Sequence, residues 1–161
     1  MENLFVDLDR EIASTRRLLE RYPPGKGEWQ PHDKSRTLSA LATHVAAIPN
    51  HGANILTTAE MDVATRQPQP PKDSAAELLE AFDAGVARLK SAIAGVDAAK
   101  LRENWTMRMG SRVLVSEPRA LLMRLMVLNH LVHHRAQLGV YLRLLNVPIP
   151  GMYGPSADEP V

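Results

Sequence analysis

The longest predicted helix covers residues 116–146, SEPRALLMRLMVLNHLVHHRAQLGVYLRLLN. Its apolar residues recur three or four positions apart, which is the period of a helix that packs one face against its neighbours. Ser116 or Glu117 is the expected N-terminal cap, and Pro118 suits the first turn, where a missing backbone N–H costs nothing. Pro148 cannot continue the helix and places its end near residue 146.

Three further segments show the same period. The second of them should begin after a cap at Ser35 or Thr37, and Pro49 should bend or interrupt it. Their apolar positions are Leu4, Phe5, Leu8, Ile12, Leu18, Leu19 and Tyr22, then Leu38, Leu41, Ala42, Val45 and Ile48, then Leu78, Leu79, Phe82, Val86, Leu89 and Ile93. Helical stripes without strands to build a sheet core predict an all-α fold, a four-helix bundle, as a single domain over residues 1–161.

The period changes from about four to two in residues 104–115. Trp105, Met107 and Met109 alternate with polar residues, and Gly110 can make a tight turn before the alternation resumes. This pattern predicts a short β-ribbon just before the last helix.

Two histidines in the last helix have the spacing of metal ligands. His130 and His134 are four residues apart, so their rings project from one face of the helix about one turn apart. Because the chain has no cysteine, a metal site must be built from nitrogen and oxygen donors. His44 is the natural third donor, since its apolar neighbours Val45 and Ile48 turn the second helix toward the rest of the protein.

Other interpretations of these histidines remain open from spacing alone. His133 is three residues from His130, which is also a possible spacing for two metal ligands. A helical wheel favours His134, which lies about 40° from His130, over His133, which lies about 60° away. A pair of histidines four residues apart is by itself a weak signal of a metal site, since both rings can be satisfied without any metal. His51 either lines the mouth of the site or is a satisfied surface residue. Leu131 excludes a zinc protease of the HExxH type, which needs glutamate at that position.

Three neutral imidazoles favour zinc, nickel, copper or iron(II) over calcium or magnesium. They also leave a coordination position open, as catalytic metal sites do. Two polar residues share the predicted metal-facing stripe and are the catalytic candidates. Tyr141 could donate to a substrate or bound water, and Gln137 could orient a ligand ring. Interior packing of a satisfied hydroxyl and amide explains both positions equally well. Arg135 points to another face and is expected in a structural ion pair or at a dimer surface.

The composition excludes several classes of protein. Nineteen basic residues against eighteen acidic ones give a formal charge of +1, which argues against a nucleic-acid binder that depends on phosphate neutralisation. No run of eighteen apolar residues exists to cross a membrane. The first residues are acidic and lack the pattern of a secretory signal, so a cytoplasmic location is expected.

Three segments together resemble one known family. They are TLSALATHVA at 37–46, NHLVHHRAQL at 129–138 and YGPSADE at 153–159. In this combination they closely resemble the DinB-like (YfiT-like) superfamily, and the resemblance extends over essentially the whole chain.

The resemblance implies His44, His130 and His134 as the ligands of a divalent metal, with His133 outside the coordination shell. Zinc or nickel is the expected ion, and iron or manganese also falls within the range. It further implies a four-helix bundle that forms homodimers.

The activity implied by the resemblance is metal-dependent chemistry with a low-molecular-weight thiol and a small-molecule substrate, of the S-transferase or thiol-dependent isomerase type. Two alternatives stand beside it. One is hydrolysis by metal-bound hydroxide, and the other is a non-catalytic, metal-binding, stress-related protein.

Overall fold

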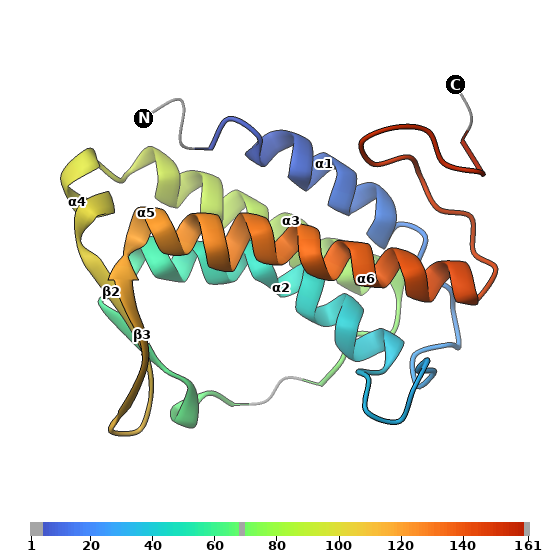
Figure 1. Ribbon diagram of the computed structural model, residues 1–161, viewed down its shortest axis with the longest axis horizontal. Coiled ribbons are helices and arrows are strands. Elements are labelled where there is room, and N and C mark those ends of the chain that lie inside the picture. Colours follow the sequence, from blue (N-terminus) through green and yellow to red (C-terminus); the bar gives the residue numbers. More distant parts are fainter. Residues whose placement is uncertain (1–4, 68–69, 160–161) are drawn as a thin grey trace.

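The computed structural model describes residues 5–67 and 70–159, and most of these residues are helical (Figure 1). The helices are α1 (Leu8–Leu19), α2 (Leu38–Thr57), α3 (Ala75–Ala94), α4 (Ala98–Arg102), α5 (Arg119–Leu122) and α6 (His130–Leu144). The segment Met123–Asn129 is π-helical and joins α5 to α6 without a break. We refer to these three segments together as the α5–α6 helix.

The long helices pack along the long axis of the molecule (Figure 1). α2 lies against both α3 and α6, and α1 also contacts α3 and α6. The apolar stripes expected from the sequence meet in one core. Its fully buried side chains include Leu18, Leu41, Phe82, Leu89, Leu122 and Leu138. None of the helices among the described residues is both long and apolar enough to cross a membrane.

α2 continues through Pro49 and is visibly bent in Figure 1. Close approach to α3 at this point depends on glycine. A Cβ atom added to Gly85 would lie 3.0 Å from the backbone nitrogen of Asn50. The helix pair can therefore pack tightly where the proline disturbs the regular hydrogen bonding.

A small sheet lies at one end of the helices. β2 (Asn104–Met109) and β3 (Arg112–Pro118) form the expected antiparallel ribbon, and Gly110 has the positive φ of +60° that the turn requires. β1 (Glu60–Asp62) pairs in parallel with β2. A 3₁₀ turn at Val63–Thr65 follows β1 directly in the chain. The predicted ribbon is therefore present, and β1 extends it to a three-stranded sheet that the sequence analysis did not predict. A three-residue strand is too short to show a period of two, which is why the sequence did not reveal β1.

The last helix starts later than predicted. Ser116 and Glu117 belong to β3, where they pair with Thr106 and Trp105, and the helix begins at Arg119 without a side-chain cap. Pairing with β2 holds these residues in the strand. α1 likewise begins only at Leu8. Leu4, which we expected in its stripe, lies outside the described residues.

A buried arginine fastens the start of the α5–α6 helix to the end of α2. The Arg119 guanidinium donates hydrogen bonds to the carbonyl oxygens of Ile55 and Thr58, the second at 2.8 Å. These carbonyls belong to the last turn of α2 and its cap, where helical partners run out. The two helices that carry the histidines are thus held together at this end.

Candidate metal centre

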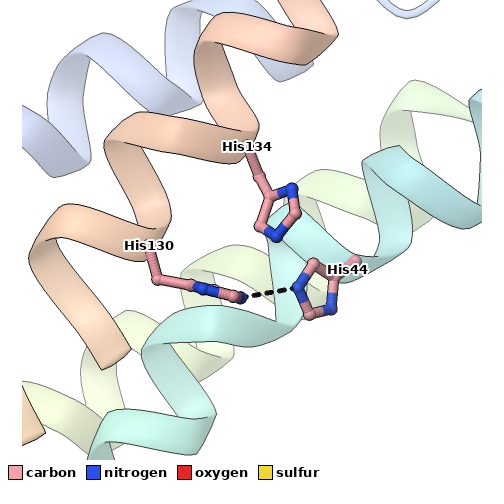
Figure 2. A group of neighbouring side chains, drawn as sticks. All are labelled: His44, His130 and His134. Carbon is pink, nitrogen blue, oxygen red and sulfur yellow. Dashed lines mark hydrogen bonds between the residues drawn. The ribbon is translucent and has the colours of Figure 1, made fainter. Parts of the chain in front are cut away.

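α2 and α6 bring three histidines together. Thr37 caps α2 by accepting a hydrogen bond from the Ala40 N–H at 3.3 Å, so α2 begins at Leu38 and His44 lies in its second turn. His130 is the first residue of α6, and His134 follows one turn later. Figure 2 shows the three rings turned toward one another. One ligand nitrogen from each ring lies within 4.8 Å of the others.

The spacing of these nitrogens fits a metal ion. The Nε2 atoms of His44 and His130 are 2.8 Å apart and share a hydrogen bond in which either ring can donate. Two imidazole nitrogens bound to one tetrahedral zinc ion, each at about 2.0–2.1 Å, would be about 3.3 Å apart. The three residues could therefore hold one metal ion with small movements of their side chains.

Gln137 orients the third ring. The Nδ1–H of His134 donates to Oε1 of Gln137 at 2.7 Å. A neutral imidazole carries one proton, so a proton on Nδ1 leaves the lone pair on Nε2, which faces the other two histidines. The contact agrees with one of the two interpretations of Gln137, that its side chain orients a ligand ring.

All three rings favour the neutral, metal-binding form. Burial is the largest cause that lowers the pKa of His44 to about 4, and it also lowers the pKa of His130 and of His134. The positive charge of Arg36 lowers each of these pKa values further, and Arg66 adds to the effect on His44. No carboxylate in the described part of the chain contributes to these shifts.

The π-helical segment ends immediately before His130. A π-helical turn holds about one residue more than an α-helical turn, so it rotates the following residues by roughly 100° about the helix axis. The direction in which His130 and His134 face α2 therefore depends on this segment. Residues 123–129 carry no sequence signal that distinguishes them from an ordinary helix, and the prediction missed it.

A cavity of about 190 Å³ opens beside two of the histidines. Its lining comes from α2, the sheet, the segment that follows β1, the π-helical segment and α6. It consists of His44, Ala47, Ile48, His51, Met61, Val63, Arg66, Met107, Met126 and His130. His51 therefore lies at the site and not on a separate surface. Its ring also contacts Trp105 edge-on, with centroids 5.8 Å apart, and burial lowers its pKa to about 4.

Two other predicted residues lie elsewhere. The Tyr141 hydroxyl donates to the carbonyl oxygen of Arg36 at 3.3 Å, and its ring packs edge-on against Trp29. Its described partners are therefore in the segment before α2, although a role toward a substrate stays a prediction. His133 is exposed and contacts the ring of His134, with centroids 4.8 Å apart. Met61 and Arg66 were not singled out from the sequence. Met61 lies in the short strand β1 and Arg66 in the loop that follows the 3₁₀ turn, and neither segment shows a pattern in the sequence.

The family model of the DinB superfamily matches residues 7–138. The chain belongs to the DinB superfamily. This confirms the resemblance seen in the sequence. No curated protein matches the chain.

Two solved DinB-like structures share the fold of this DinB superfamily member. The protein from Bacillus cereus ATCC 10987 is 18% identical, with a TM-score of 0.71, and the match covers 95% of this chain and 97% of that one. The protein from Bacillus subtilis is 14% identical, with a TM-score of 0.68, and the match covers 98% and 99% of the two chains. At these identities the likeness concerns the fold alone.

Proposed function

We propose that this DinB superfamily member binds one divalent metal ion, zinc or nickel, through His44, His130 and His134. In this proposal it is an enzyme of the S-transferase type that acts with a low-molecular-weight thiol. We also propose that α1, α2, α3 and the α5–α6 helix are the four helices of the bundle expected from the sequence. The observation that carries the proposal is the convergence of three neutral imidazoles, with their nitrogens within 4.8 Å, beside a cavity.

The donor set favours borderline-soft ions. Neutral nitrogen donors suit zinc, nickel or iron(II), whereas calcium and magnesium prefer oxygen. A divalent ion bound here would supply Lewis acidity, which lowers the pKa of a coordinated thiol or water. The protein would keep the imidazoles neutral by burial, orient His134 through Gln137, and hold the substrate in the cavity.

The cavity favours thiol chemistry over hydrolysis. A metal-bound hydroxide mechanism usually relies on a nearby general base such as a carboxylate. Within residues 5–67 and 70–159, no aspartate or glutamate lines the cavity. A thiol is already partly ionised near neutral pH and is a strong nucleophile without such a base.

Metal binding is tested by competition against a chromophoric chelator, with zinc and nickel added to the metal-free protein. His130→Ala should weaken zinc binding by more than about a hundredfold, because it removes a ligand and not merely a supporting contact. His133→Ala is the matched control in the same helix and should bind zinc like the wild type. Equal affinities in the two variants would overturn the proposed ligand set.

Activity is tested with zinc-loaded protein, glutathione or cysteine, and 1-chloro-2,4-dinitrobenzene as a broad electrophile. Turnover should require both metal and thiol and should be lost in His130→Ala. Hydrolysis of p-nitrophenyl acetate without thiol would instead indicate the hydrolase alternative. Metal binding with neither activity, together with unfolding when the metal is removed, would indicate a structural site.

Homodimer formation is part of the same proposal. Exposed apolar side chains follow the α5–α6 helix, namely Leu121, Leu125, Val140 and Leu144. A second copy of the chain could cover them, since a row of exposed leucine and valine is costly in water. Light scattering after size-exclusion chromatography measures the molecular mass directly.

A further inference from the structure

The cavity beside the three histidines has an apolar wall built from several separate elements. Its apolar residues come from α2, β1, the 3₁₀ turn, β2 and the π-helical segment: Ala47, Ile48, Met61, Val63, Met107 and Met126. Three of the six are methionines, whose flexible side chains adapt to ligands of different shape. The main body of a ligand in this cavity should therefore be apolar.

The size of the cavity limits that ligand. One water molecule takes up about 30 Å³ in the liquid, so a volume of about 190 Å³ corresponds to roughly six waters. Drug-sized ligands occupy pockets of about 300–1,000 Å³, which is larger. A small molecule of roughly six to nine non-hydrogen atoms fits these limits.

One charged side chain, Arg66, lines the cavity, and no residue of the described ranges neutralises its charge with an ion pair. The nearby Arg108 pairs with Glu60 at 2.7 Å and with Asp62 at 2.6 Å. Arg66 has no ion pair with any residue in the described ranges, and its positive charge acts on both His44 and His51, where it lowers the pKa.

Arg66 also borders an adjacent cavity that Glu60 and Asp62 line. Those two carboxylates are already held by Arg108 and, for Asp62, by the backbone N–H groups of Ala64 and Gly110. The guanidinium of Arg66 therefore remains available to an external anion. A planar guanidinium matches a carboxylate group especially well, because it can donate two parallel hydrogen bonds.

We infer that the cavity binds a small apolar carboxylic acid as its carboxylate, with the carboxylate on Arg66 and the apolar chain against the methionine wall. The far end of such a ligand reaches His44 and His130, which line the same cavity. That such an acid is the substrate class of the proposed enzyme rests on the proposed function. The binding itself does not require a metal.

Methionine methyl groups report on this binding at separate places in the protein. The chain has seven methionines, and protein labelled with ¹³C at the methyl carbon can be titrated with hexanoate in the absence of metal. We expect shifts at Met61, Met107 and Met126, which line the cavity. Met152 lines a different cavity, beneath the C-terminal tail, and should not move. Shifts confined to Met152, or no shifts at all, would overturn the inference.

The charge requirement is tested with a neutral ligand and a matched variant. Hexanamide has the shape of hexanoate without the charge. Arg66→Gln should weaken hexanoate binding roughly three- to fivefold, as expected for a partly exposed ion pair, and leave hexanamide binding unchanged. Arg112→Gln removes the same charge from the exposed hairpin and should have no effect. Equal hexanoate affinity in wild type and Arg66→Gln would contradict the assignment.

A second variant tests the location without touching any charge. Ala47 lines the cavity, and Ala47→Leu narrows it, so both hexanoate and hexanamide should bind more weakly. Unchanged binding of both ligands in a folded Ala47→Leu protein would place them elsewhere.

Zinc affinity measured on the same samples separates this inference from the proposed function. If zinc does not bind but hexanoate shifts the three cavity methionines, the proposed function fails and the carboxylate site stands. If zinc binds through the three histidines but hexanoate leaves those methyl groups unchanged, the carboxylate site fails and the metal site stands.

Discussion

The two sides of α6 differ in whether their basic side chains have an acidic partner among the described residues. His134 and Arg135 are neighbours in the sequence, yet His134 faces α2 and the candidate metal centre, whereas Arg135 contacts α1. On the α1 side the Arg135 guanidinium forms an ion pair with Glu11 at 2.6 Å, and only 3% and 7% of these two side chains are exposed. On the α2 side the basic groups have no acidic partner among the described residues.

The α1 side is a closed network. Arg135 donates to the Tyr153 hydroxyl at 2.7 Å and to Thr15 at 3.3 Å, and Tyr153 in turn donates to Glu11 at 2.9 Å. These bonds tie the C-terminal tail to α1 and α6. Buried charges persist in proteins when they are paired and hydrogen-bonded in this way. The network therefore has a structural role. The Arg135–Glu11 ion pair confirms the expectation of a structural ion pair for Arg135.

The histidine side shows the complementary arrangement. Burial keeps its imidazoles neutral, their nitrogens converge, and the charge of Arg66 borders the same cavity without a counter-charge in the described ranges. Basic groups at a cavity that have no acidic partner among the described residues are available to a ligand. In this protein the presence or absence of an acidic partner, more than burial, distinguishes the structural network from the candidate site.

Breaking the closed network should have the largest effect. Arg135→Met leaves the Glu11 carboxylate buried without its cation, which should lower the free energy of unfolding by about 3–5 kcal/mol. Urea denaturation measures the change. Arg17→Gln breaks an exposed pair with Glu159 and should cost less than about 1 kcal/mol. Zinc affinity of folded Arg135→Met should match the wild type, and a large loss would show that the two sides are coupled.

Lowering the pH should decrease the free energy of unfolding of the metal-free protein, because the buried histidines have lowered pKa values. The pKa of His51 is about 4 in the folded state, against about 6.5 for an unfolded histidine. Above pH 6.5 both states are neutral and nothing changes. As the pH falls from 6.5 to about 4, the unfolded state takes up the proton first, so the free energy of unfolding decreases.

The same window applies to His44, whose pKa is also about 4. His51→Gln should remove about 2 kcal/mol of the loss between pH 7 and pH 4.5, as urea unfolding at several pH values would show. His32→Gln, in an exposed loop, is the control. An identical pH dependence in His51→Gln and wild type would contradict the burial of this imidazole.

Removing the ring-orienting contact should have the smallest effect. Gln137→Ala deletes the acceptor for His134 Nδ1–H and should weaken zinc binding about tenfold, the lower end for a residue that supports a ligand. Gln137→Glu keeps an acceptor at this position and should bind zinc at least as well as the wild type. The chelator competition assay distinguishes the two variants, and equal weakening by both would argue against an orienting role.

The sequence alone determined the features that repeat along one helix or one ribbon. The periodicity of its apolar residues predicted the long helices, the alternation around Gly110 predicted the ribbon, and four-residue spacing placed His130 and His134 on one face. Each of these features depends on neighbours within a few residues, so the pattern is visible locally. Motifs around His44 and His130 also indicated the family, which the comparison with the DinB superfamily confirmed.

Only the tertiary structure decided the features that join distant segments. Glu11 and Arg135 are 124 positions apart, β1 pairs with a strand more than forty residues away, and Arg66 reaches the cavity from a loop. The π-helical segment before His130 is local, but its sequence is compatible with an ordinary helix as well. These contacts form because particular surfaces meet when the core packs. The free energy of that packing is shared among residues whose spacing in the chain shows no regular period.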